Sequence, residues 1–422
     1  MKLLTLLLAF VVVLGAQRKG VVPASGPAPV GPYSPGVIAD GYLYVSGQGA
    51  KTADGQMPAT FEAQAQQTLD NVKAVVEAAG LTLDHVVYTH AYLEDISNSA
   101  GLDRVYARYF SKDPPARALI GVARLPGTPV EINAVAVLDL NGRTPVRVPG
   151  LDTGPPFSPG MLTHDRLFIS SLPGRAASGN IPADPASEVD AALDAFKAVT
   201  DAAALSLAHV VFVNPYLTAS IPSAIMNERY ARRFEFGNTP ARATISVSAL
   251  PEGRIVYTGV AVRDLSKRKA VRPKNMAPSA TASPCVFAGD TLYCSAKSGF
   301  IPGPLSGIYA ATVEHQLRQT MRNQLDNLEE AGLSFDDVVA ANVYLDNVDD
   351  FAKMNAVYAQ YFPGPVKPAR TTVQQVAPGK RHPDANGAYP ALEQVSFVAI
   401  RTPSTTLAGM TDITQDRRRR WH

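Results

Sequence analysis

Apolar residues recur at helical spacing in three long stretches of the chain. The first runs from Phe61 to Ala79 and stops at Gly80, and its apolar positions mark one face of a helix. Similar stretches cover residues 187–203 and 312–331. Each is followed by a segment rich in β-branched and aromatic residues, which predicts a strand. These predicted strands cover residues 85–93, 209–217 and 338–345.

The predicted helices and strands occur in the same order three times along the chain. In the first copy, residues 37–46 predict a hairpin, 102–110 a second helix, and 117–122 and 130–138 two further strands. A Pro-Ala-Arg tripeptide precedes the first of these two strands in every copy. A unit of about 125 residues is therefore present as three tandem repeats. The order strand, strand, helix, strand, helix, strand, strand is typical of an α+β sheet with its helices on one face.

Three domains also fit the length of the chain, because 422 residues exceed one ordinary hydrophobic core. We expect repeat 1 at residues 27–141, repeat 2 at 150–265 and repeat 3 at 274–402, with polar, basic or Pro-containing linkers between them. Repeat 3 has an additional Gly/Pro-rich insertion at residues 378–390, between its last two strands.

The two ends of the chain differ from the repeats. Lys2, the apolar run over residues 3–13 and the small residues up to Ala16 predict a signal peptide at 1–16, and hence export to a periplasm or the extracellular space. A helix that is retained as an anchor is the alternative. No other segment predicts a membrane span. Residues 403–422 predict a disordered basic tail, in which positions 417–420 are all arginine.

The composition and the motifs of the chain mainly argue against particular classes of partner and site. A net charge of +2 with 18% charged residues does not indicate a nucleic-acid partner. The seven histidines and two cysteines show no metal-ligand spacing, and no Gly-rich phosphate loop or nucleophile elbow occurs. We therefore expect no metal and no cofactor.

The two cysteines flank a predicted hairpin that turns at Gly289-Asp290. Counting outward from the turn places Cys285 directly opposite Cys294, where side chains lie closest. The pair is a candidate for a cross-strand disulfide in an oxidising compartment. Two unlinked thiols are the alternative.

The segments around the Pro-Ala-Arg tripeptides resemble the RidA (YjgF) family. The resemblance is close over residues 28–140, and weaker but continuous over 150–265 and 275–401. The blocks that carry it in repeat 1 are Gly31-Pro32-Tyr33-Ser34, Ser46-Gly47-Gln48, the helix 69–80, the stretch 115–125 and Val130-Glu131-Ile132.

The resemblance implies three tandem chorismate-mutase-like domains of the α+β class, each a mixed sheet with two helices on one face. It also implies a homotrimer with clefts between subunits. Because this chain holds three copies, we expect a monomeric, intramolecular pseudo-trimer with three clefts between repeats.

The function implied by the resemblance is hydrolysis of 2-imino or enamine acids to 2-keto acids and ammonia. In repeat 1 the resemblance implies that Arg117 binds the substrate carboxylate and that Glu131 orients the attacking water. An arginine is a planar, bidentate and always charged donor, and an ionised carboxylate can accept a proton from water. Tyr33 and Ser46 match positions whose hydroxyls line the pocket, and Gly47 offers a backbone amide.

Some positions depart from the family's pattern. The second helix usually carries an Asn that reaches across the interface, and repeats 2 and 3 keep it as Asn227 and Asn355, whereas repeat 1 has Asp103. Leu119 stands where many members have a reactive Cys, so we expect no sensitivity to thiol reagents of that kind.

Repeats 2 and 3 are less complete than repeat 1. Repeat 2 keeps Arg242 and Ser170 but has Phe157 and Val256 where Tyr and Glu are expected. Repeat 3 matches at Arg370, Glu393 and Ser295 and has Ala282 in place of the Tyr. We expect one competent site in repeat 1, an incomplete site in repeat 3 and a binding-only or structural site in repeat 2. The alternative function is a non-catalytic scaffold on the same fold that binds small carboxylates or other proteins.

Overall fold

The computed structural model describes residues 18–149, 156–303, 307–385 and 387–402. The predicted signal peptide and the predicted basic tail lie outside the described residues, so export stays a prediction of the N-terminal sequence. Among the residues that are described, no helix combines the length and the apolar character needed to cross a membrane.

Each repeat has one long helix that begins at a polar capping side chain. Thr60, Asp184 and Thr312 each accept a hydrogen bond from the backbone amide three residues further on, which satisfies a donor that the helix itself leaves unpaired. The three helices lie within about two residues of their predicted bounds. They are α1 (Phe61–Ala78), α3 (Pro185–Ala202) and α5 (Val313–Glu330).

The second helix of each repeat is shorter and packs beside the long one. These helices are α2 (Ser99–Tyr109), α4 (Ser223–Ala231) and α6 (Phe351–Tyr358). In repeat 1 the apolar side chains of α1 and α2 share a core with one face of the sheet. The equivalent helices do the same in repeats 2 and 3. Both helices of a repeat therefore cover one face of its sheet, as predicted.

The sheet of each repeat is mixed, and its strand order is the same in all three. Repeat 1 has the order β1-β2-β3-β6-β4-β5, in which only β4 and β5 are parallel. Its strands are β1 (Lys19–Val21), β2 (Gly36–Ala39), β3 (Tyr42–Gly49), β4 (Val86–Leu93), β5 (Ala116–Gly121) and β6 (Val130–Val137).

Repeats 2 and 3 follow this order, although the parallel edge strand of repeat 2 is broken into β11 and β12. Repeat 2 contains β7 (Thr144–Val146), β8 (Gly160–Leu162), β9 (Arg166–Pro173), β10 (Val210–Leu217), β11 (Ala241–Arg242), β12 (Ile245–Ser246) and β13 (Ile255–Val262). Repeat 3 contains β14 (Arg268–Val271), β15 (Cys285–Ala288), β16 (Thr291–Lys297), β17 (Val338–Leu345), β18 (Ala369–Gln374) and β19 (Glu393–Ile400).

The segments that we predicted as linkers are partly strand. β7 and β14 lie within them, and each pairs with the first predicted strand of the following repeat. Repeat 1 has a matching strand, β1, ahead of residue 27. Such short strands in polar sequence show too little alternation of apolar and polar residues to be recognised.

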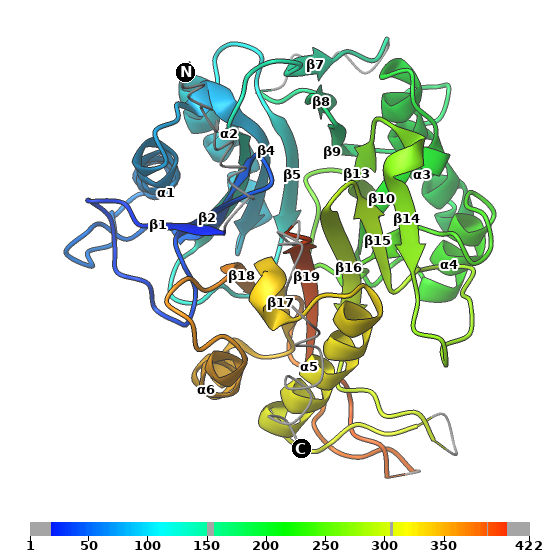
Figure 1. The fold of residues 1–422 in the computed structure, drawn as a ribbon. Helices are drawn as coiled ribbons and strands as arrows, with labels where there is room; N and C mark the ends of the chain where they lie inside the picture. The colour runs from blue at the N-terminus through cyan, green and yellow to red at the C-terminus, as the bar shows by residue number, and fades with distance from the viewer. Residues whose placement is uncertain (1–17, 150–155, 304–306, 386, 403–422) are drawn as a thin grey trace, which may run out of the picture.

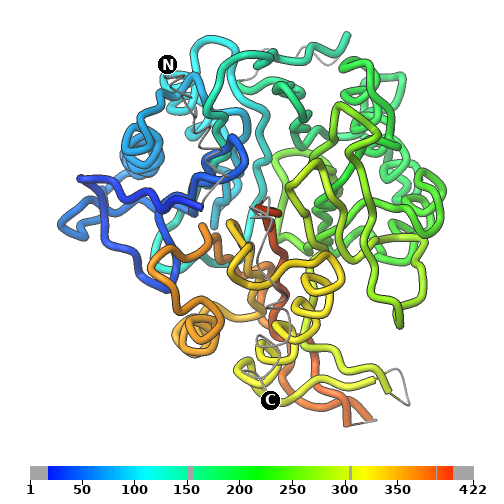
Figure 2. The backbone as a smooth tube through the Cα atoms, viewed as in Figure 1, coloured from blue at the N-terminus to red at the C-terminus, as the bar shows by residue number. Residues whose placement is uncertain are grey.

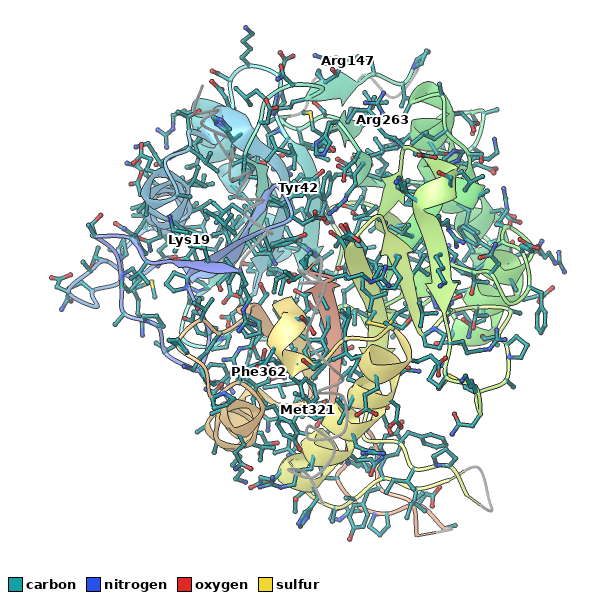
Figure 3. All side chains as sticks on the ribbon, in the orientation of Figure 1. Lys19, Tyr42, Arg147, Arg263, Met321 and Phe362 are labelled. Carbon is teal, nitrogen blue, oxygen red and sulfur yellow. A yellow bond between two sulfur atoms is a disulfide. The ribbon has the colours of Figure 1, made fainter. Side chains whose placement is uncertain are left out.

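The three repeats pack around a shared centre. In Figure 1 the helices lie on the outside and the sheets face inward, and in Figure 2 the blue–cyan, green and yellow–red thirds of the chain meet in the middle. Apolar strand residues of all three repeats form one buried cluster. Tyr42 of repeat 1, labelled near the centre of Figure 3, lies 6.0 Å from Phe168 of repeat 2 between ring centroids.

A buried ion network also joins all three repeats at this centre. The guanidinium of Arg166, in repeat 2, stacks over Tyr42 at 4.4 Å. Its Nη2 donates to Asp40 of repeat 1 at 2.9 Å and to Thr291 of repeat 3 at 2.6 Å. Because burying an unpaired charge is costly, these contacts of Arg166 hold the three repeats together at the centre.

Neighbouring repeats are joined by the same hydrogen bond three times. The backbone amides of Arg117, Arg242 and Arg370 each donate to a serine hydroxyl of the next repeat at 2.8 Å. The acceptors are Ser170, Ser295 and Ser46, in that order. Repeat 1 therefore meets repeat 2, repeat 2 meets repeat 3, and repeat 3 meets repeat 1. We name the contacts the Arg117, Arg242 and Arg370 interfaces.

A disulfide joins Cys285 to Cys294 across β15 and β16. The residues of this hairpin pair in the register counted from the turn, with Ala288 opposite Thr291 and the two cysteines opposite each other. Both cysteines of the chain are used in this bond.

Candidate functional site

A cavity of about 90 Å³ lies at the Arg370 interface. Repeat 3 contributes Arg370, Phe351 and Thr372 to its wall. Repeat 1 contributes Tyr33, Gly47 and Glu131, together with most of the Pro-rich segment that precedes Gly31. The cavity therefore brings an arginine of one repeat to a glutamate of another.

Arg370 is a buried cation that forms no ion pair with a carboxylate of the described residues. It is 3% exposed, and its guanidinium lies over Tyr358 at 4.9 Å and Tyr33 at 5.3 Å. Within the described residues its backbone amide donates to Ser46 and Nη1 donates to the sulfur of Met354, and no carboxylate lies within ion-pair distance of the guanidinium. Burial lowers the pKa of Arg370, while the nearby tyrosines and Glu131 raise it. Such a guanidinium is suited to an incoming carboxylate.

Gly31 keeps the approach to Arg370 open. A Cβ atom at this position would lie 2.6 Å from Nη2 of Arg370 and 3.1 Å from both terminal atoms of Asn355. Asn355 belongs to repeat 3, so this asparagine does reach across the interface, as the resemblance implied, but it arrives together with Arg370 from the same repeat.

Glu131 is the acidic group of the cavity. It is 8% exposed, and burial raises its pKa to about 8, although the charge of Arg370 and a backbone hydrogen bond from Thr372 oppose that rise. A Cβ atom on Gly47 would overlap Oε1 of Glu131, so the carboxyl group occupies the place of a side chain there. A carboxyl group with a pKa near neutrality can both accept and return a proton.

Tyr33 forms the aromatic wall of the cavity. Its hydroxyl accepts a hydrogen bond from the backbone amide of Val30 at 3.3 Å. Burial raises the pKa of Tyr33 above its usual value, so the phenol keeps its proton and remains a hydrogen-bond donor.

The predicted pairing of Arg117 with Glu131 in one site is wrong. Both residues belong to repeat 1, but β4 separates their strands: Arg117 lies opposite Thr89, and Glu131 lies opposite Tyr92. Two strand spacings and three residues along the strand place their Cα atoms about 14 Å apart. The arginine that shares a cavity with Glu131 is Arg370.

The hydroxyl of Ser46 was predicted to line the pocket, but Ser46 is not part of the cavity wall. It is 1% exposed, donates to the carbonyl oxygen of Ser34 at 2.6 Å and accepts from the Arg370 amide at 2.8 Å. Ser170 and Ser295 make the same two bonds in the other interfaces. These serines fix the arginine strand of the neighbouring repeat, whereas Gly47 lines the cavity.

At the Arg117 interface the guanidinium already has a carboxylate. Asp103 pairs with Arg117 at 2.7 Å, and the rings of Tyr106 and Phe157 lie over the guanidinium at 4.9 and 4.7 Å. Val256 takes the register position of Glu131, opposite Tyr216. The guanidinium of this interface is therefore neutralised internally, and the position of Glu131 carries no carboxylate.

The assignment of Glu393 as the counterpart of Glu131 is also wrong. Glu131 lies opposite Tyr92 in β4, and the residue opposite the equivalent Tyr344 is Gln394. Glu393 is one position earlier, so its side chain lies on the opposite face of the sheet. There it accepts a hydrogen bond from Thr320 of α5, and burial raises its pKa to about 8.

The Arg242 interface combines features of the other two. Nη1 of Arg242 donates to Oδ1 of Asn227 at 2.9 Å, and the guanidinium lies over Tyr230 at 5.0 Å. Gln394, opposite Tyr344, and Ala282 take the positions of Glu131 and Tyr33. Arg242 forms no ion pair with a carboxylate within the described part of the chain.

Several parts of the cavity wall were missed by the sequence analysis, among them Phe351 and Thr372 of repeat 3 and the segment before Gly31. Thr372 lies two residues after Arg370 in β18, at the position that corresponds to Leu119, and no motif distinguishes it. Pro23 and residues 25–30 precede the first block that carries the resemblance, and the sequence analysis assigned them no role. Among the described residues no cluster of histidine, cysteine or acidic side chains could hold a metal ion.

Three segments of the chain match the family model described as Endoribonuclease L-PSP, at residues 24–138, 151–256 and 273–380. The chain belongs to this family. The three tandem domains predicted from the sequence are thereby confirmed, as is the resemblance to RidA proteins.

Curated relatives of the L-PSP family match one repeat at a time. A RutC family protein from Saccharolobus solfataricus is 44% identical over 124 residues, which is 28% of this chain and 98% of that protein. The 2-iminobutanoate/2-iminopropanoate deaminase of Escherichia coli is 40% identical over 126 residues, 29% of this chain and 98% of the relative. A solved structure, the YjgF gene product from E. coli, is 39% identical and covers 29% of this chain and 99% of its own, with a TM-score of 0.28.

Proposed function

We propose that the Arg370 interface hydrolyses 2-imino acids to 2-oxo acids and ammonia. The observation that carries the proposal is a buried guanidinium without a carboxylate partner in the same cavity as a carboxyl group whose pKa is raised to about 8. The deaminase name of a relative that is 40% identical supports the same reaction class. The roles below belong to the proposal.

Arg370 binds the carboxylate of the substrate through parallel N–H donors, which fixes the adjacent imine carbon. Glu131, in its ionised form, accepts a proton from a water molecule as the water oxygen adds to that carbon. The C–N bond then breaks, the C=O bond forms, and both protons of the water leave on the ammonia. The ring of Tyr33 closes one side of the guanidinium, which strengthens its attraction for an anion by excluding water.

We further propose that one chain takes the place of three subunits, because all three interfaces are formed within it. A non-catalytic carboxylate-binding scaffold remains the alternative function. Nuclease activity is not part of the proposal, because a net charge of +2 does not indicate a nucleic-acid partner.

The test measures ammonia and 2-oxo acid released from 2-iminobutanoate, which an amino-acid oxidase generates in situ. Arg370→Met is compared with Arg117→Met, because methionine keeps the alkyl stem under the aromatic rings and removes the charge. Light scattering checks that the active species is a single chain.

We expect wild type to exceed the spontaneous rate and Arg117→Met to match wild type. Arg370→Met should lose about 100-fold or more in kcat/KM, since each charge-assisted hydrogen bond is worth about 1.5–3 kcal/mol. Full activity in Arg370→Met, or loss in Arg117→Met alone, would contradict the assignment. A folded wild type that does not exceed the spontaneous rate would favour the scaffold.

A further inference from the structure

We propose that Lys51 selects substrates with a second carboxylate, so that the cavity at the Arg370 interface acts on 2-imino dicarboxylic acids. The inference rests on the proposed function of that interface and names its class of substrate. Arg370 holds the carboxylate next to the imine carbon, and the ammonium of Lys51 holds the carboxylate at the end of the substrate's side chain.

Lys51 is one of the residues that line the cavity. Gly47 and Gly49, which precede it on the same segment, line the cavity as well and bring no side chain into it. The backbone here is fixed from α1, because Asn71 donates to the carbonyl oxygens of Gly49 and Lys51 at 2.9 and 2.8 Å. The side chain of Lys51 therefore starts from a well-held backbone at the wall of the cavity.

The positions of Lys51 and Gly127 carry an ion pair in repeat 2. Arg175 corresponds to Lys51, because each lies two residues after the end of its strand, β9 or β3. Glu252 corresponds to Gly127, because each lies three residues before the start of its strand, β13 or β6. Arg175 and Glu252 form a salt bridge. Repeat 2 thus supplies this cation with a carboxylate of its own.

In repeat 1 the corresponding carboxylate is missing. A Cβ atom on Gly127 would lie 3.5 Å from Nζ of Lys51, so an acidic side chain at this position would reach the ammonium. Lys51 forms no ion pair with a carboxylate of the described residues. Gly127 itself lines the cavity, so the space that an acidic side chain would fill is open to a ligand.

The charges of the cavity wall favour a substrate with two carboxylates. Among the described residues that line the cavity, Lys51 and Arg370 are cationic and Glu131 is acidic. A substrate with one carboxylate pairs with Arg370 and leaves Lys51 without a partner, whereas a second carboxylate leaves neither cation unpaired. Lys51 is half-buried, so water screens its attraction for an anion in part. We therefore expect a preference of several-fold rather than an absolute requirement.

The experiment compares hydrolysis of 2-iminoglutarate and 2-iminobutanoate by the full chain, with each imine generated in situ by an amino-acid oxidase. Wild type should have the lower KM for 2-iminoglutarate. Lys51→Met should lower the ratio of kcat/KM for 2-iminoglutarate to that for 2-iminobutanoate by about fivefold or more, through KM rather than kcat. Arg175→Met removes the corresponding cation of repeat 2, so this matched control should keep the wild-type ratio.

A second pair of variants separates charge from bulk. Gly127 has a φ of +73°, which asparagine and aspartate adopt more readily than most other residues. Gly127→Asp supplies Lys51 with an internal carboxylate, so it should lower the substrate ratio further than the neutral Gly127→Asn. Equal ratios in these two variants, or a wild-type ratio in Lys51→Met, would overturn the inference and make Lys51 a solvated lysine at the rim of the cavity.

Binding of 2-oxoglutarate and 2-oxobutanoate, measured by calorimetry, tests Lys51 without hydrolysis. Tighter binding of 2-oxoglutarate that is lost in Lys51→Met would retain the inference even if no imine is hydrolysed, and would make the protein a scaffold that binds dicarboxylates. Hydrolysis of 2-iminobutanoate that depends on Arg370, with the same substrate ratio in wild type and Lys51→Met, would retain the deaminase and remove the role of Lys51. Equal affinity for the two oxo acids, without any hydrolysis, would remove both.

Discussion

The Arg370 and Arg117 interfaces share a scaffold and differ in what faces the guanidinium. Both arginines are 3% exposed, and both stack on a tyrosine of their own repeat at 4.9 Å. Arg117 meets the carboxylate of Asp103, whereas Arg370 meets a cavity and, across it, Glu131. The fold thus supplies a positioned cation at both interfaces, and the residue that faces it determines whether the cation is paired internally, as at Arg117, or borders a cavity, as at Arg370.

The difference also shows why the complete site could not be assigned to one repeat. Arg370, at the parallel edge of its sheet, faces Glu131 of the next repeat, so the residues of this cavity come from two repeats. Loss of Tyr and Glu in repeat 2 therefore affects the Arg117 interface, and their presence in repeat 1 completes the Arg370 interface.

The largest effect on activity is expected from replacing Glu131, in comparison with the other buried glutamate, Glu393. Glu131→Gln should lower the rate of imine hydrolysis by about 10²–10⁴-fold, because the amide cannot act as a general base. Glu393→Gln is the matched control, since burial raises the pKa of both groups to about 8 but Glu393 bonds to Thr320 on the helix side of its sheet. Steady-state ammonia release measures both. Equal losses in the two variants would refute the register assignment.

The pH dependence of kcat/KM compares Glu131 and Glu393 in a second way. Glu131 is protonated below its pKa and cannot then accept a proton, so kcat/KM of wild type should rise with pH and level off above about 8. Glu393→Gln should keep this rise, and the residual activity of Glu131→Gln should lack it. A flat wild-type profile between pH 6 and 9 would speak against a general-base role for Glu131.

The long elements were predictable from the sequence, and the partners within the site were not. Apolar periodicity placed the three long helices because a helix of this length repeats its apolar face several times. The pairing of Arg370 with Glu131 depends on contacts between residues more than two hundred positions apart, which no local pattern records.

The misassigned Glu393 is a different kind of error, because the sequence did contain the answer. Val395, Phe397 and Ala399 are buried in the core of repeat 3, and Glu393 shares their alternation. In repeat 1 the core residues are Val130, Ile132 and Ala134, and Glu131 lies out of phase with them. The phase of the alternation is a better guide to the face of a strand than a matching residue type.

A smaller effect is expected from the glycine beside Glu131. Gly47→Ala should displace the carboxyl group of Glu131, and a displacement of about 1 Å can cost about 100-fold in rate. Ala296→Gly changes the equivalent position of repeat 3, where no glutamate lies in register, and should leave the rate unchanged. Comparing kcat/KM of the two variants tests the placement. Wild-type activity in Gly47→Ala would show that Glu131 tolerates another position.

The smallest effect on activity, and the most direct test of the comparison, comes from Asp103→Asn. The variant makes the Arg117 interface resemble the Arg242 interface, so it should leave hydrolysis unchanged and add a further equivalent of 2-oxobutanoate in calorimetry. It should also lower the free energy of unfolding by about 1–2 kcal/mol, because the buried Arg117 loses a charged partner that is itself 37% exposed.

Asp349→Asn breaks the exposed ion pair with Arg124 and controls for loss of a surface charge. If Asp103→Asn gains no ligand and loses no stability relative to that control, the aspartate does not stand in for a bound carboxylate, and the Arg117 interface is closed by its aromatic rings instead.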